Sequence, residues 1–168
     1  MKKALLVIDV QEVFVGENHT KLFNYDRGLV DRINSIIEEN RNNVIVYIRH
    51  IMKRNLLNRL APYHIYENTP QAEFANALKI ISDNKFVKYE GNAFSNPDLD
   101  KFLKENGIDT VEVTGIDGGA CVPMTALGAI KNGYRVIVNN NGIGTVKLHK
   151  KKKEKYDIKL KQLGAEFR

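Results

Sequence analysis

The sequence predicts an α/β domain in which a mainly parallel six-stranded sheet lies between two layers of helices. Short apolar runs rich in β-branched residues alternate with helical patterns along the 168 residues. Most of these runs lack the strict alternation of a half-exposed strand, as expected where both faces of a parallel sheet are covered. No linker or repeat divides the chain. We therefore expect one three-layer α/β/α domain over residues 1–168, with right-handed crossovers.

The elements follow from local patterns. Strands are expected at residues 4–10, 44–50, 85–89, 110–116 and 134–140, with a short last strand within 165–168. Five helices are expected between or after them: one with the apolar face Leu29, Ile33, Ile36 and Ile37; one with Phe74, Ala77, Leu78 and Ile81; one following the cap Asn96 and ending before Gly107; one from about Cys121 to Asn132; and one through the lysine-rich segment. The third has the usual signals, with Pro97 in its first turn and glycine just past its end.

Composition restricts the protein class. The chain is 43% hydrophobic and 27% charged, typical of a globular protein, and no stretch approaches the ~18 apolar residues of a membrane span. The single cysteine excludes an intrachain disulfide and favours the cytoplasm. The N-terminal apolar run meets Asp9 early and lacks a small-residue cleavage site. We therefore interpret it as the first strand, not as a signal peptide.

The net charge of +6 lies on one segment. Residues 147–161 hold eight lysines against Glu154 and Asp157, and the rest of the chain is balanced. A nucleic-acid-binding surface spreads its basic residues over the fold, so no nucleic-acid partner is expected. The run Lys150–Lys153 opposes the dipole at a helix start. It is interpreted as a solvated face or oligomer rim, with weak attraction of an anionic substrate or partner as the alternative.

Three polar residues stand at predicted strand ends: Asp9, Lys88 and Cys121. Each alone has an ordinary interpretation, as a turn aspartate, a solvated lysine and a buried small side chain. Together they match nucleophilic catalysis, because a helix start and an ammonium group lower the pKa of a thiol and a carboxylate can take its proton. The preceding Gly118-Gly119 allows a turn that aims main-chain amides at an oxyanion. The first turn, "DVQEVFVGENH", lacks a glycine-rich phosphate loop, which argues against nucleotide binding.

Three stretches then resemble the isochorismatase-like cysteine hydrolases, a superfamily that includes nicotinamidases and N-carbamoylsarcosine amidases. They are "ALLVIDVQEVF", "FVKYEGNAFSNPDLDKFLKENGIDTVEVTGI" and "GIDGGACVPMTALGAIKNGYRV". The resemblance covers nearly the whole chain. It implies a Rossmann-like fold, a cofactor-free hydrolysis of a small amide or related C–N carbonyl compound through a thioester, and a dimer or tetramer.

The resemblance also assigns roles to residues. It implies a catalytic triad of Asp9, Lys88 and Cys121, a cis peptide at Ile116–Asp117, an oxyanion hole formed by the backbone N–H groups of Asp117 and Cys121, and a substrate contact by Phe14. For Phe14, a core or lid-packing role is equally compatible with the sequence.

Two departures from the family limit the assignment. The nicotinamidase branch binds a metal through one aspartate and three histidines, whereas this chain offers only Arg49 and His50 after strand two, and His64 further on. We interpret each of these histidines as an ordinary surface or pocket residue and expect no catalytic metal, which leaves nicotinamidase as the alternative. The family commonly has Thr-Asp where this chain has Gly118-Gly119, so we expect either a softer oxyanion turn or a different substrate that approaches the turn closely. A catalytically silent binding module on the same fold is the second alternative.

Overall fold

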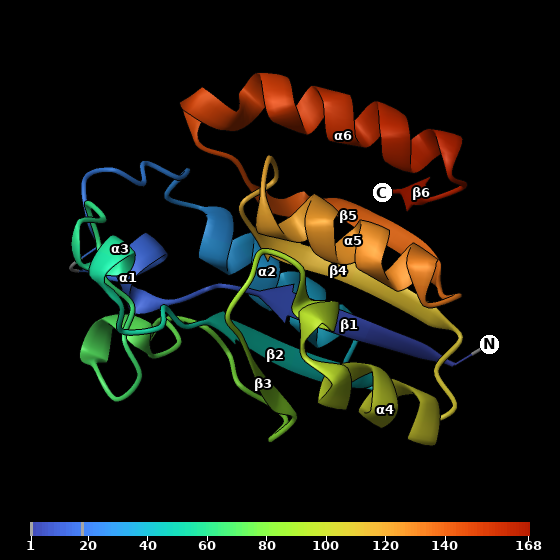
Figure 1. Cartoon of the computed structure of the whole chain (residues 1–168). Coiled ribbons are helices and arrows are strands. Elements are labelled where there is room, and N and C mark those ends of the chain that lie inside the picture. The colour runs from blue at the N-terminus through green and yellow to red at the C-terminus, as the bar shows by residue number, and fades with distance from the viewer. Residues whose placement is uncertain (1, 18) are drawn as a thin grey trace.

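Six parallel strands form one sheet in the order β3-β2-β1-β4-β5-β6 (Figure 1). The computed structural model describes residues 2–17 and 19–168, with only the backbone of residue 57. The strands are β1 (Lys3–Ile8), β2 (Val44–His50), β3 (Lys85–Lys88), β4 (Thr110–Ile116), β5 (Arg135–Gly144) and β6 (Glu166–Phe167). The order reverses between β1 and β4, which is where doubly wound folds place their sites.

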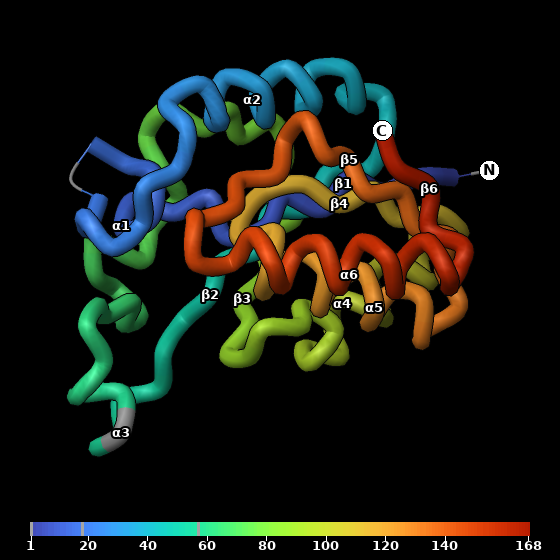
Figure 2. The backbone as a smooth tube through the Cα atoms, turned by 90° about the horizontal axis from the view of Figure 1, so that it is seen from above, coloured from blue at the N-terminus to red at the C-terminus, as the bar shows by residue number. Residues whose placement is uncertain are grey.

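Helices cover both faces of this sheet. The α-helices are α1 (Glu12–Val15), α2 (Leu29–Glu39), α3 (Leu56–Arg59), α4 (Pro97–Glu105), α5 (Cys121–Lys131) and α6 (Lys150–Gln162), and short 3-10 turns are η1 (Pro70–Ala72), η2 (Ala93–Ser95) and η3 (Lys147–His149). Seen from above, α2 lies on one side of the sheet, and α4 and α5 lie on the other (Figure 2). Two separate apolar cores result, one on each face. The predicted three-layer α/β fold is confirmed.

Most predicted elements are present. Helix α4 begins where the sequence indicates: the Asn96 side chain accepts a hydrogen bond from the Asp98 amide at 3.0 Å, and Gly107 after its end has a φ of +65°. The lysine-rich segment forms α6, which contacts α5 and buries Leu160. Among the described residues, no helix combines the length and apolarity needed to cross a bilayer.

The helix predicted around residues 74–81 is wrong. This segment instead runs beside the start of α1, where Phe74 forms an antiparallel bridge with Gln11. The Ala75 amide donates to the Val10 carbonyl at 3.0 Å. The Phe74 ring packs against Tyr47, with the ring centres 5.8 Å apart. Residues 74–81 therefore form an extended segment, which we call the strap. Its main chain forms hydrogen bonds with the segment before α1 in place of the hydrogen bonds of a helix.

The ends of β1 and β4 approach each other closely at Gly115. Gly115 has a φ of +117°, a conformation that residues with a side chain rarely adopt. A Cβ atom here would overlap the carbonyl oxygen of Ile8. This contact holds the residue after β1, Asp9, beside the turn that leads from β4 into α5.

Replacing Gly115 by alanine therefore strains the backbone and forces β1 and β4 apart. We expect Gly115→Ala to lower the free energy of unfolding by about 3 kcal/mol or more, as measured by urea denaturation. Gly28→Ala is the control, because a Cβ atom there meets only the ends of the Arg32 and Asp26 side chains. Equal stability of the two variants would contradict this account of the strand junction.

Candidate active site

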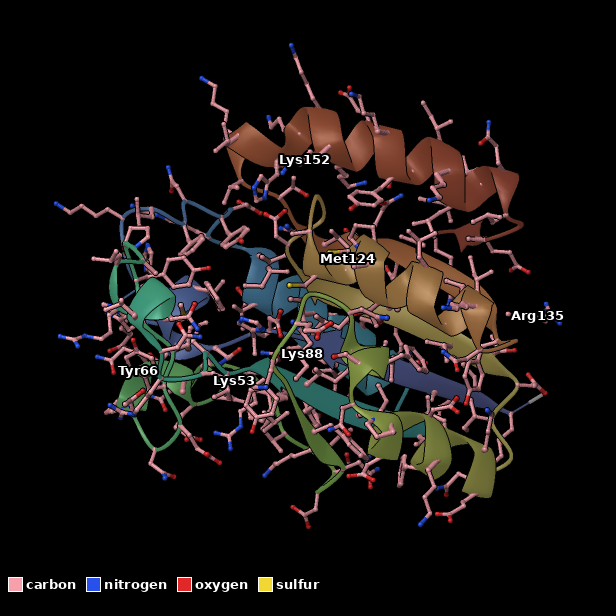
Figure 3. All side chains as sticks on the ribbon, viewed as in Figure 1. Lys53, Tyr66, Lys88, Met124, Arg135 and Lys152 are labelled. Atoms are coloured by element: carbon pink, nitrogen blue, oxygen red, sulfur yellow. The ribbon has the colours of Figure 1, made fainter. Side chains whose placement is uncertain are left out.

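The ammonium group of Lys88 contacts the other two residues that the sequence singled out, Asp9 and Cys121. Lys88 is the last residue of β3, is 1% exposed, and is labelled in Figure 3. Its Nζ atom lies 2.8 Å from Asp9 Oδ2 and 3.2 Å from Cys121 Sγ. It also donates to the main-chain carbonyl of Glu90 at 3.1 Å. The carboxylate of the residue after β1 and the sulfur at the start of α5 thus share one buried cation.

Asp9 presents its carboxyl group from a sharp bend after β1. Its φ of +56° lies in the left-handed region. The bend is fixed by its amide, which donates to the Ile48 carbonyl at 2.8 Å, and by its carbonyl, which accepts from the Gln11 amide at 2.9 Å. One carboxylate oxygen binds Lys88, whereas Oδ1 is buried and has no hydrogen-bond partner within the described chain. Asp9 therefore keeps a free acceptor for a proton.

His50 joins the site, although its sequence context indicated only an ordinary surface or pocket residue. Its Nδ1 atom lies 3.4 Å from Lys88 Nζ. Because an ammonium group can only donate, Nδ1 acts as the acceptor and the ring proton is on Nε2. Burial and the charge of Lys88 lower the pKa of His50, which favours this neutral form. Its position at the last residue of β2 was the signal that could have identified it.

Gln11 holds the main chain around His50 and was not predicted. Its side-chain amide accepts from the His50 amide at 2.8 Å and donates to the His50 carbonyl at 3.0 Å. It also donates to the Ala72 carbonyl at 2.8 Å and is fully buried. This residue replaces a strand partner at the edge of the site, because it satisfies both main-chain groups of His50.

The thiol of Cys121 departs from the expected behaviour. A lowered pKa was predicted from the helix start and Lys88, but the pKa is raised to about 12 by burial and by the charge of Asp9, which together outweigh Lys88. For Lys88, burial opposes the charge, but Asp9 and Cys121 raise its pKa overall. At neutral pH the site therefore holds a neutral thiol beside an ion pair. We therefore expect thiol reagents to label Cys121 slowly near neutral pH.

The turn from β4 into α5 leaves two amides unused. The Ile116–Asp117 peptide bond is cis. The Gly118 amide donates to the Gly144 carbonyl, and those of Ala120 and Val122 donate to the carbonyl of Asp117. The Gly119 amide donates to the Asp117 side chain at 2.7 Å. Within residues 2–17 and 19–168, the amides of Asp117 and Cys121 are left without an acceptor.

The side chain of Asp117 holds this turn in place, a role that was not predicted from the sequence. Its Oδ1 accepts from the Gly119 amide and lies 2.9 Å from His149 Nδ1. Its Oδ2 accepts from the Val146 amide at 2.9 Å and from the Tyr25 hydroxyl at 3.2 Å. The carboxylate, 8% exposed, thus has four hydrogen-bond partners.

The expectation of a soft turn at Gly118-Gly119 is therefore corrected. A Cβ atom on Gly119 would come within 2.6 Å of the His149 carbonyl oxygen and 2.7 Å of its Cβ. A Cβ atom on Gly118 would overlap the Thr145 hydroxyl. The glycines leave room for residues 145–149 to pack on the turn, and these contacts hold it in place.

Aromatic rings border the site. Phe14 is 8% exposed and packs edge-on against Phe23, with ring centres 4.8 Å apart, and against Tyr63 at 5.9 Å. The pKa of Tyr63 is raised by burial and, to a lesser extent, by electrostatic interaction with Cys121 and Asp9. Phe14, Phe23 and Tyr25 also line a cavity of about 260 Å³ whose walls include none of the triad residues. Phe14 thus packs within this aromatic group, and its contact with a substrate stays a prediction.

The side chains do not fit a metal site of the nicotinamidase kind. His50 contacts Lys88, while His64 is exposed and stacks on Tyr66, with ring centres 5.2 Å apart. Within the described part of the chain, no three His, Cys, Asp or Glu side chains are grouped so that they could hold a metal ion.

The raised thiol pKa predicts an unusual response to Asp9→Asn. The substitution removes the negative charge but keeps the Lys88 ammonium, so the pKa of Cys121 falls and the thiolate fraction rises. We expect iodoacetamide to alkylate the variant faster than the wild type at pH 7.5. In the wild type the rate should climb about tenfold per pH unit from pH 7 to 9 without a plateau. Asp83→Asn, at a fully exposed carboxylate, serves as the control. Slower alkylation of Asp9→Asn would contradict this electrostatic arrangement.

Known proteins resemble this chain in sequence. The chain is 25% identical to an uncharacterized isochorismatase family protein of Bacillus subtilis (strain 168) over 150 residues, 88% of this chain and 81% of the relative. It is 26% identical to a probable inactive nicotinamidase of Arabidopsis thaliana over 163 residues, 87% and 83% of the two chains.

Solved structures share the fold. An isochorismatase-like hydrolase from Alkaliphilus metalliredigens superposes with a TM-score of 0.81 and 28% identity, covering 100% of this chain and 94% of the other. An N-carbamoylsarcosine amidase from Thermoplasma acidophilum gives 0.81 and 26%, covering 100% and 96%. The profile of the isochorismatase domain matches residues 3–167. The chain therefore belongs to the isochorismatase family of hydrolases.

Proposed function

We propose that this protein is a cysteine hydrolase that cleaves a small amide or related C–N carbonyl compound through a thioester on Cys121. The observation that carries the proposal is the shared cation: Lys88 Nζ lies 2.8 Å from Asp9 and 3.2 Å from Cys121 Sγ. The two unused amides of the neighbouring turn supply the complementary half of an acyl-transfer site.

The first half of the reaction begins from a neutral thiol. As Sγ approaches the substrate carbonyl carbon, its proton passes to the Asp9 carboxylate, and a C–S bond forms while the C=O π electrons move to oxygen. The resulting oxyanion accepts hydrogen bonds from the amides of Asp117 and Cys121. When the carbonyl re-forms, the C–N bond breaks. The nitrogen leaves with the proton that Asp9 held, and the acyl group stays on sulfur.

In the second half of the reaction, water hydrolyses the thioester with the help of Asp9 and the same two amides. Asp9 takes a proton from the water molecule as its oxygen attacks the thioester carbonyl. The same two amides hold the second oxyanion. When the C–S bond breaks, the sulfur leaves with its electron pair and takes the proton back from Asp9. The carboxylic acid product departs, and the site returns to a neutral thiol beside the ion pair.

Lys88 and His50 surround the reacting groups with the charges that these reaction steps need. Asp9 is 2% exposed, and the Lys88 ammonium 2.8 Å away balances the negative charge of its carboxylate. His50, neutral, accepts from the same ammonium without adding a positive charge. Lys88 can therefore stabilise Asp9 and, transiently, the developing thiolate.

The surroundings support a small substrate. Aromatic rings form a wall near the turn: the Tyr25 hydroxyl donates to Asp117 at 3.2 Å, and Phe14 packs against Tyr63. Such walls suit a compact, partly flat acyl group. The N-carbamoylsarcosine amidase relative agrees with a C–N carbonyl substrate. A cytoplasmic location and a dimer or tetramer remain predictions.

Two alternatives remain distinct from this proposal. Nicotinamidase activity of the metal-binding branch is disfavoured because the described side chains form no suitable ligand group. A silent binding module is suggested by the relative called a probable inactive nicotinamidase. The close contacts among Asp9, Lys88 and Cys121 and the two unused amides argue for retained catalysis.

A screen of small amides, ureas and carbamoyl compounds tests the proposal. We expect the wild type to release ammonia or an amine from at least one of them, and Cys121→Ala to abolish turnover while it keeps the far-UV circular dichroism spectrum of the wild type. Asp9→Asn should lower kcat at least ~100-fold despite its more reactive thiol, because no base then accepts the proton. Turnover that survives in Cys121→Ala would overturn the mechanism, and a wild type without any turnover would favour the binding module.

A further inference from the structure

The segment between β5 and α6 packs directly on the turn that carries the two unused amides. His149 is the last residue of η3, and its Nδ1 atom lies 2.9 Å from Asp117 Oδ1. Its own main chain occupies the space left by the missing side chain of Gly119. Asp117 therefore meets His149 on the same oxygen that holds the Gly119 amide.

We propose that His149 is a positioning residue for the hydrolysis, acting through Asp117 to orient the oxyanion amides. The inference rests on the proposed function. An ionised carboxylate can only accept, so His149 Nδ1 donates the proton in this hydrogen bond. Asp117 provides both the carboxylate that His149 contacts and one of the two unused backbone amides. A donor that anchors the carboxylate thus limits how far that amide can turn.

The neighbouring donors do not make His149 redundant. Tyr25 and the Val146 amide both donate to Oδ2, on the other side of the carboxyl group. On Oδ1 the partners are the Gly119 amide, which is part of the turn itself, and His149, which reaches it from 32 residues further along the chain. His149 is therefore the Oδ1 partner that ties the turn to a separate element, in addition to the ties at Oδ2.

This arrangement also gives a reason for Gly118-Gly119. Where the family commonly carries Thr-Asp, the turn can be held by side chains of its own. Here a side chain at residue 119 would collide with the main chain of His149. The chain instead places the carboxylate at residue 117 and the donor at residue 149. The glycine pair and His149 therefore act together. His149, from the segment between β5 and α6, takes the place of side chains within the turn in holding it.

The test separates oxyanion chemistry from thiol reactivity. Acylation by p-nitrophenyl acetate requires an oxyanion: Sγ attacks the ester carbonyl, the thiol proton passes to Asp9, and the C–O bond to p-nitrophenolate breaks with its electron pair on oxygen. Alkylation by iodoacetamide displaces iodide at a saturated carbon and forms no oxyanion. Both rates are measured on the full chain, with Cys121→Ala as the background.

His149→Ala is expected to slow acylation about tenfold to hundredfold and to leave alkylation within about twofold of the wild type. His149→Asn should restore most of the acylation rate, because its amide nitrogen is attached at the same distance along the side chain as Nδ1. His149→Gln should not, because its amide lies one bond further out. For the amide found by the screen, the loss should appear in kcat, with KM little changed.

The opposite results would overturn the inference. They are a wild-type acylation rate in His149→Ala, a parallel loss of acylation and alkylation, or a failure of His149→Asn to restore what His149→Ala loses. A wild type that alkylates but acylates no faster than Cys121→Ala would overturn the proposed function, and this inference with it. The first three results concern His149 alone, so the two failures are distinguishable.

Discussion

The site depends on one buried ammonium group shared by a carboxylate and a thiol. Placing Lys88 and Asp9 away from water costs several kcal/mol per ion, and the cost is offset only when geometry and hydrogen bonds are good. Lys88 meets that condition with Asp9, Cys121, His50 and the Glu90 carbonyl around its Nζ atom. These partners come from different strands and a helix, so the cation also determines how the ends of β1, β2 and β3 meet the start of α5.

The same interaction explains why the thiol is held in its neutral form. A helix start and a lysine favour a thiolate, but burial and the ionised Asp9 oppose it more strongly, and the pKa of Cys121 rises. The nucleophile is then produced only when its proton moves to Asp9, in the step that also forms the C–S bond. A raised thiol pKa fits general-base catalysis, and a permanently ionised cysteine is not required.

The sequence predicted what depends on periodicity and strand ends. It predicted the parallel sheet and placed Asp9, Lys88 and Cys121 at one edge, because such ends converge in a doubly wound fold. It failed for the strap at residues 74–81, whose spacing is helical but whose main chain pairs with the segment before α1. The role of Gly118-Gly119 could not be predicted either, since it depends on residues 145–149 packing onto the turn, a contact that no local pattern encodes.

The most direct test of the shared-cation account compares acyl transfer in the wild type and in Lys88→Met. After acid quenching of a reaction with p-nitrophenyl acetate, peptide mass mapping should find the acetyl group on Cys121 of the wild type. In folded Lys88→Met it should find almost none, because Asp9 and Cys121 then lack the cation that stabilises their negative charges during proton transfer. An acetyl group on another residue, or Cys121 acylation at the wild-type rate without Lys88, would contradict the account.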